Sequence, residues 1–171
     1  MTIRHILKYP DERLRTIATP IAVFDDALKT LVDDMFETMY DDDGAGLAAT
    51  QINVHQRVIV IDLSRDRSAP SVFINPVIVE SNGTSCHEEG CLSVPGVFAP
   101  VKRATWVRVT YQDINGQSHE FSSGEGDRLT VAIQHELDHL NGILYIDHLS
   151  PLRQKMLIKR YNKVNEHDNQ L

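Results

Sequence analysis

The spacing of apolar residues predicts three helices. In segment 25–40 they recur every three or four positions, and the aspartates at its start can cap a helix. The same spacing predicts a second helix over about 129–141. It is followed by Gly142, and a glycine just past the last turn commonly ends a helix. A third helix is predicted over about 152–165, close to the C-terminus.

Segments rich in valine and isoleucine predict strands between these helices. Segments 57–63 and 72–80 have this composition. In segment 104–113, apolar side chains alternate with a set that includes polar ones. Segment 117–121 follows an Asn-Gly pair, which is the strongest short-range signal for a hairpin. The order of these elements indicates an α+β fold, with antiparallel strands packed around the central helix 129–141 and a further helix at the C-terminus.

The length and net charge of the chain exclude some classes of protein. The 171 residues suit one core, so we expect a single domain over residues 1–171. A net charge of −7 argues against binding to DNA, and the sequence has no apolar run like that of a signal peptide or membrane span. We therefore expect a cytoplasmic protein with no membrane partner. In a reducing compartment, Cys86 and Cys91 favour metal binding, catalysis or burial over a disulfide.

The second helix contains an HExxH sequence, which is typical of a metal hydrolase. His135 and His139 are one turn apart, about 6 Å along the axis, so both imidazoles can reach one metal ion. Glu136 lies about 100° around the helix, where its carboxylate can take a proton from a water on that metal. Glu136 also falls on the apolar stripe of the helix, and a carboxylate facing a core is costly unless a cation or partner is near.

The third metal ligand is not fixed by this motif. The sequence is similar to the start of the metzincin pattern, but Tyr145 stands where that pattern has its third histidine. The other candidates lie within one short segment: Cys86, His87, Glu88, Glu89 and Cys91.

Three motifs in order resemble the peptide deformylase family of bacterial type. Segment 44–51 has the pattern GxGxAAxQ, segment 89–93 reads EGCLS, and segment 134–139 reads QHELDH. The resemblance covers nearly the whole chain and implies that it forms one deformylase-like catalytic domain. It also implies that Cys91 is the third ligand. The metal would be Fe(II), with Zn(II), Ni(II) or Co(II) as substitutes.

The resemblance further implies the reaction. The N-formyl group would leave the terminal methionine of nascent polypeptides as formate, after metal-bound hydroxide attacks the formyl carbon with Glu136 as general acid/base. Gln51 and the Leu92 backbone N–H would stabilise the formyl oxygen, since such neutral donors suit an oxyanion. The implied substrate-binding residues are Gly44, Ala45, Gly46, Gly90, Val131 and His135.

Three positions depart from the family. Ala45 replaces a branched residue of many relatives, Arg128 stands where relatives tend to have an apolar residue, and Phe98 stands where several carry arginine. Arg128 either points outward, with Asp127 capping the helix, or changes the side-chain preference of the pocket. These differences leave the reaction unchanged and bear only on the preference for methionine.

The C-terminal helix, about 151–166, carries its own charge pattern. Segment 152–165 has five lysines and arginines and no aspartate or glutamate, in a chain that is acidic as a whole. A solvated basic face is one interpretation. The resemblance favours docking to the ribosome near the peptide exit.

Two further hypotheses compete with a deformylase. A structural zinc site could use Cys86, Cys91, His135 and His139, but it would leave Glu136 without a role. A zinc endopeptidase would lack its usual third ligand. Under the deformylase hypothesis, Cys86 is a small buried residue.

Overall fold

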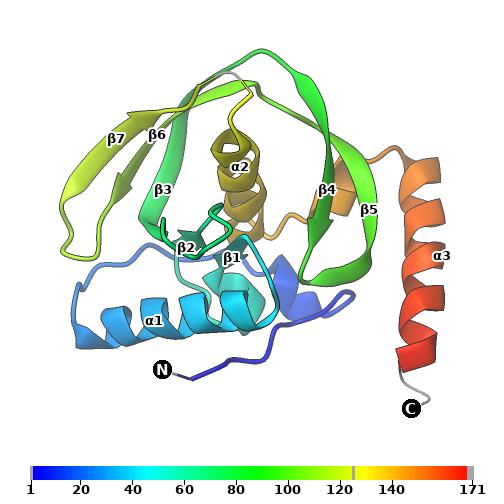
Figure 1. Ribbon diagram of the computed structural model, residues 1–171, viewed down its shortest axis with the longest axis horizontal. Coiled ribbons are helices and arrows are strands. Elements are labelled where there is room, and N and C mark those ends of the chain that lie inside the picture. The colour runs from blue at the N-terminus through cyan, green and yellow to red at the C-terminus, as the bar shows by residue number, and fades with distance from the viewer. Residues whose placement is uncertain (1, 125, 169–171) are drawn as a thin grey trace.

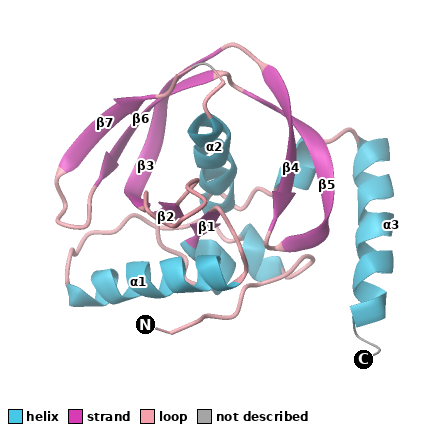
Figure 2. Cartoon of the chain, viewed as in Figure 1, coloured by secondary structure: helices cyan, strands magenta, loops and turns pink. Residues whose placement is uncertain are grey.

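A computed structural model describes residues 2–124 and 126–168 of the chain. Figures 1 and 2 show helices below, beside and between two groups of strands. The elements in chain order are η1 (Glu12–Arg15), α1 (Asp26–Asp41), β1 (Gly46–Ala48), η2 (Ala49–Ile52), β2 (Val58–Ile61), β3 (Ser71–Asn82), β4 (Ser85–Cys91), β5 (Val94–Arg103), β6 (Trp106–Gln112), β7 (Ser118–Ser122), α2 (Arg128–Leu140), η3 (Tyr145–His148) and α3 (Pro151–Asp168). No helix in the described part of the chain is long and apolar enough to cross a membrane.

Five strands form one antiparallel sheet in the order β1-β2-β3-β6-β7. The predicted hairpin is β6–β7, and Gly116 in its turn has a φ of 81°, which a glycine adopts without strain. The α+β class and the four predicted strands are confirmed. The three predicted helices are confirmed as α1, α2 and α3.

Helix α2 lies between the five-stranded sheet and the β4–β5 hairpin (Figure 1). Its residues Ile133, Leu137 and Leu140 pack in one apolar cluster with sheet residues such as Ile59 and Val107. Burial of this stripe fixes the rotation of the helix, which decides where its polar residues point. The arrangement confirms the prediction of strands around a central HExxH helix.

Helix α1 covers the sheet from below in the view of Figure 1. Asp25 caps it, since its side chain accepts a hydrogen bond of 3.0 Å from the Leu28 amide. Val32, Met35 and Met39 are buried in a cluster with sheet residues. The helix therefore stabilises the strand β1 that leads into the site.

The hairpin β4–β5 was not predicted from the sequence. Along β5, buried residues alternate with a proline, a glycine and exposed residues, which hides the strand pattern. Val97 and Val101 of β5 pack with Leu157 and Tyr161 of α3 in a second apolar cluster. Helix α3 therefore supports the outer face of this hairpin (Figure 1).

Candidate metal centre and active site

Two elements bring three metal-ligand side chains together. Cys91 ends strand β4, while His135 and His139 lie on α2, and one ligand atom of each is within 4.8 Å of the others. Cys91 Sγ lies 3.2 Å from His139 Nε2. A thiolate and two imidazoles suit zinc or ferrous iron, and three protein ligands leave a position open, as in catalytic sites. The donor set therefore fits a divalent metal ion.

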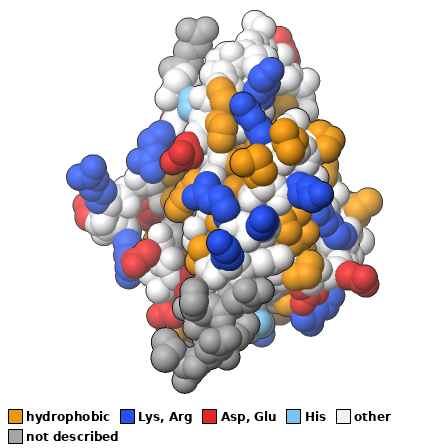
Figure 3. Space-filling view, turned by 90° about the vertical axis from the view of Figure 1, so that its right-hand side faces the viewer, with side chains coloured by type: hydrophobic (Ala, Val, Ile, Leu, Met, Phe, Trp, Pro, Cys, Tyr) orange, Lys and Arg blue, Asp and Glu red, His pale blue; other side chains and the backbone are white. Residues whose placement is uncertain are grey.

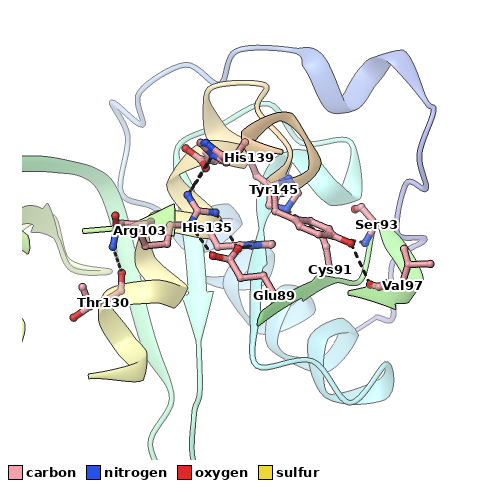
Figure 4. Close-up of polar contacts among 12 residues, drawn as sticks. Glu89, Cys91, Ser93, Val97, Arg103, Thr130, His135, His139 and Tyr145 are labelled. Carbon is pink, nitrogen blue, oxygen red and sulfur yellow. Dashed lines mark hydrogen bonds and ion pairs between the residues drawn. The ribbon is translucent and has the colours of Figure 1, made fainter. Parts of the chain in front are cut away.

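The His135 ring is held by a buried carboxylate. Its Nδ1 lies 2.7 Å from Glu89 Oε2, and the ring stacks on Tyr145 with centroids 5.9 Å apart (Figure 4). Arg103 donates to both oxygens of Glu89, at 2.7 and 2.9 Å. Burial opposes ionisation of Glu89, but the hydrogen bonds from Arg103 and His135 outweigh it and lower the pKa of Glu89 to about 2. An ionised Glu89 fixes the donor at Nδ1 and leaves Nε2 for a metal.

The electrostatic surroundings of the two histidines favour a cation between them. Burial opposes the charged form of His135, yet hydrogen bonding with Cys91 and Glu89 raises the pKa of His135 well above its ordinary value. Burial and the neighbouring His135 lower the pKa of His139 well below its ordinary value, which favours the neutral, metal-binding imidazole. A metal ion can supply the positive charge that a proton would otherwise supply at His135.

Glu136 is buried next to the ligands, although it is a carboxylate. It is 5% exposed, and its Oε2 has no hydrogen-bond partner among the residues that the structure describes. Burial raises the pKa of Glu136 to about 7, a value suited to a group that accepts and returns protons near neutral pH. Gly46 of β1 makes room for it, because a Cβ on Gly46 would lie 2.5 Å from Glu136 Oε1.

Gln51 points its amide nitrogen at the ligand cluster. Its Oε1 accepts a hydrogen bond of 2.9 Å from the Ala48 amide, which fixes which end of the side chain faces the site. Its Nε2 donates to Ser93 Oγ at 3.1 Å and lies 3.6 Å from Cys91 Sγ. The buried amide is therefore a fixed donor beside the candidate metal position.

A pocket of about 770 Å³ opens onto these side chains. It is lined by all of the residues expected to act on the substrate and by the expected ligand Cys91: Gly44, Ala45, Gly46, Gln51, Gly90, Cys91, Leu92, Val131, His135 and Glu136. His139 lies deeper, at 1% exposure, behind the other two ligands. The structure therefore places each residue predicted for the site either in the pocket wall or directly behind it.

Comparisons with known proteins agree with this geometry. The sequence profile of the polypeptide deformylase family matches residues 3–155. A peptide deformylase of Pseudoalteromonas translucida is 50% identical over 163 residues, which cover 95% of this chain and 96% of that protein. The chain belongs to the peptide deformylase family.

Solved structures of deformylases share its fold. The peptide deformylase of Legionella pneumophila superimposes with a TM-score of 0.94 at 48% identity, covering 99% of each chain. The deformylase of Ehrlichia chaffeensis, solved in complex with actinonin, gives a TM-score of 0.88 at 35% identity and covers 95% of this chain and 98% of that one.

Several contacts at this deformylase pocket were not predicted from the sequence. Lys8 lines the pocket and donates to the Leu92 carbonyl oxygen at 2.7 Å, across 84 residues of sequence. Ser93 Oγ accepts a hydrogen bond from Gln51. The sequence named Ser93 only as part of the EGCLS motif and did not predict this contact. Arg103 and its partner Glu89 are ion-paired and buried, and no sequence spacing links them.

The departing positions lie at the mouth of the deformylase pocket. The Phe98 side chain is exposed and covers Gly90, where a Cβ would lie 2.5 Å from the ring. Arg128 is exposed and lines the pocket, while Asp127 caps α2 through the Leu129 amide. Arg128 is thus both outward-pointing and within the pocket rim.

The expectation that Cys86 is buried was wrong. Cys86 is exposed on β4 and lies opposite Lys102 in the hairpin register, because the strand directs alternate residues to opposite faces. Among residues 2–124 and 126–168, the metal-ligand cluster consists of Cys91, His135 and His139. The alternative of a closed four-ligand zinc site with Cys86 is therefore not supported.

Proposed function

We propose that this protein removes the N-formyl group from the terminal methionine of nascent polypeptides and releases formate. The observation that carries the proposal is the pocket in which Glu136 lies beside the Cys91, His135 and His139 cluster, in a chain of the deformylase family. A substrate that emerges from the ribosome places the proposed reaction in the cytoplasm.

The side chains divide the reaction among them. A divalent ion held by Cys91, His135 and His139 would supply Lewis acidity and lower the pKa of water. Glu136 accepts the proton of the attacking water at Oε2 and passes it to the leaving amine nitrogen. Gln51 Nε2 and the Leu92 backbone N–H donate to the formyl oxygen as negative charge develops there.

The proposed metal is Fe(II), with Zn(II), Ni(II) and Co(II) as substitutes. The proposal is supported by the mixed thiolate and imidazole ligands and by the family resemblance. The measurement is metal content and turnover after anaerobic purification, followed by exposure to air. Activity that is lost in air and restored by Fe(II) supports iron, whereas full activity of an air-stable zinc form contradicts it.

Formate release from a formyl-Met tripeptide tests the reaction. The protein is purified anaerobically and reloaded with Fe(II). We expect release that disappears in Glu136→Ala while the metal content is retained. Cys86→Ser is the matched control, because this exposed cysteine lies outside the cluster and should keep full activity. No release with Fe(II), Ni(II) or Zn(II) despite bound metal would contradict the proposal.

The pocket is proposed to receive the methionine side chain against Ala45 and Val131, with Arg128 at its rim. Turnover of formyl-Met, formyl-Leu and formyl-Glu peptides tests this. We expect formyl-Met to be preferred. A preference for the formyl-Glu peptide that disappears in Arg128→Leu would instead show that the arginine sets specificity.

Helix α3 is proposed to dock the enzyme to ribosomal RNA near the peptide exit. Leu152 and Met156 of this helix are 69% and 61% exposed. Figure 3 shows hydrophobic and basic side chains interspersed on the side of the molecule where α3 lies. The exposed basic side chains of this helix are Arg153, Lys155, Lys159, Arg160 and Lys163. Backbone phosphates attract such a surface even though the whole chain is acidic.

A charge reversal tests this docking without disturbing the buried side of α3. The double variant Lys159→Glu and Lys163→Glu should weaken sedimentation with ribosomes, and raised salt should weaken binding of the unmodified protein. Lys29→Glu on α1 is the matched control at an exposed lysine. Equal binding of both variants would contradict the docking proposal.

A further inference from the structure

His148 lies at the outer end of a continuous series of polar contacts that reaches a metal ligand. It is the last residue of η3, and its side chain is 34% exposed. Its Nε2 lies 2.6 Å from Asp138 Oδ2, next to the ligand His139 in sequence but on another side of α2. Neither the HExxH motif nor the other two motifs include this histidine.

The series continues inward through one arginine. Asp138 Oδ2 accepts a hydrogen bond of 2.6 Å from Arg103 Nη1, and the Nε and Nη2 of the same guanidinium bind Glu89. Glu89 Oε2 in turn lies 2.7 Å from His135 Nδ1. The Arg103 and Glu89 side chains are each 4% exposed, so the inner contacts are shielded from water (Figure 4).

The planar fork of Arg103 is shared between two carboxylates. Its position against Glu89 depends on where Asp138 holds the third nitrogen. Asp138 is partly exposed and uses the same oxygen for Arg103 and His148. His148 Nε2 also lies 3.4 Å from Arg103 Nη1, so the histidine contacts both the carboxylate and the guanidinium. In the tautomer that carries its proton on Nε2, His148 donates to Asp138 and fixes the carboxylate that holds Arg103. Buried networks of this kind lose order when one member lacks a partner.

The segment that carries His148 is itself held in place. Arg15 donates to Asp147 Oδ1 at 3.0 Å, and the Leu144 amide donates to Asp147 Oδ2 at 2.8 Å. Tyr145 donates to the Val97 carbonyl oxygen at 3.1 Å. The contacts of Asp147 and Tyr145 fix the backbone conformation of η3. The His148 ring is therefore held next to Asp138 in advance.

We propose that His148 is a positioning residue for the metal ligand His135, acting through Asp138, Arg103 and Glu89. His148 neither lines the pocket nor belongs to the ligand cluster. Its effect is therefore on the orientation of the His135 ring and, through it, on metal retention. This inference rests on the proposed metal centre.

The test compares two substitutions of His148 in Co(II)-loaded protein. His148→Phe keeps an aromatic ring but has no donor, whereas His148→Gln keeps an N–H that can reach Asp138. His119→Phe is the matched control, because His119 pairs with Asp113 at 2.7 Å on the surface and is 42% exposed. The measurements are the visible Co(II) spectrum and the rate of Co(II) release to a chelator.

We expect His148→Phe to release Co(II) about 10-fold faster and to shift the visible bands, because a lost outer partner typically costs 10- to 100-fold in metal affinity or activity. His148→Gln should stay close to the unmodified protein, and His119→Phe should match it. A His148→Phe protein with unchanged spectrum and release rate would overturn the proposal. So would a His148→Gln protein as impaired as His148→Phe. Both readouts are independent of turnover, so they decide the role of His148 even if formyl peptides are not hydrolysed.

Discussion

Helix α2 and the hairpin β4–β5 both supply side chains of the candidate metal centre, but they hold them by different means. On α2, His135 and His139 are one turn apart, so helix geometry alone sets their separation. Cys91 reaches the same point from a two-stranded hairpin that packs on α3 and η3. The distance between hairpin and helix therefore depends on side-chain contacts between the two elements, chiefly those of Arg103 with Asp138 and of Glu89 with His135.

The contribution of the hairpin to the metal centre should be lost most completely when Cys91 is substituted. Cys91→Ser replaces a thiolate by a weak oxygen ligand, and we expect loss of both stoichiometric metal and formate release. Cys86→Ser changes the same atom type on the same strand, but on its exposed face. Metal analysis and the formate assay on both variants provide the measurement. A metal-free Cys86→Ser protein would contradict the three-ligand site and revive the structural zinc hypothesis.

The contribution of α2 to proton transfer can be removed while both of its candidate ligands stay in place. Glu136→Gln keeps the size of the side chain but cannot accept a proton, so kcat should fall by about 10²- to 10⁴-fold with metal content unchanged. A steady-state assay with metal analysis on the same samples checks this. Loss of metal together with activity would show that Glu136 acts on the ligands rather than on the proton.

The same contrast explains what the sequence could predict. Helix α2 repeats its apolar residues at one spacing, so the helix, the HExxH pair and the inward Glu136 could all be predicted locally. The hairpin offers no such pattern, because β4 is mostly polar and β5 contains prolines and a glycine. Only the family motif singled out Cys91 among the five candidates for the third ligand. The burial of Arg103 depends on contacts between residues far apart in sequence, which local patterns do not encode.

The buried ion pairs of Arg103 should dominate stability where the hairpin meets α2. Arg103 pairs with Glu89 on the neighbouring strand of the hairpin and with Asp138 on α2. Arg103→Met leaves Glu89 buried without its cation, and removing one partner of a buried pair typically costs about 3–5 kcal/mol. Arg108→Met is the matched control, since Arg108 pairs with Glu80 on the surface and should cost about 1 kcal/mol or less. Urea unfolding of the metal-free proteins measures both. Equal losses would show that the junction is held by apolar packing instead.

The smallest effect is expected away from both elements, at Asp34 of α1. Burial opposes its ionisation, but hydrogen bonds from Arg4 and the Thr2 amide outweigh this and lower the pKa of Asp34 below its ordinary value of 3.8. Such a group contributes stability at higher pH, and the contribution is lost as pH falls through its lowered pKa. Asp34→Asn should therefore cost about 1 kcal/mol at pH 7, since the Arg4 side chain is 47% exposed and solvent weakens the ion pair.

Measuring the unfolding free energy of Asp34→Asn as a function of pH separates the effect of this ion pair from the effect of the ion pairs of Arg103. The difference in unfolding free energy between Asp34→Asn and the unmodified protein should shrink as pH falls below 3.8, because the protonated aspartic acid also loses its ion pair. Metal-free protein is used, so that ligand protonation does not contribute. A difference that stays constant with pH would mean that Asp34 stabilises α1 by packing or neutral hydrogen bonds. In that case the ion pair at Arg4 would contribute little, in contrast to the buried ion pairs of Arg103.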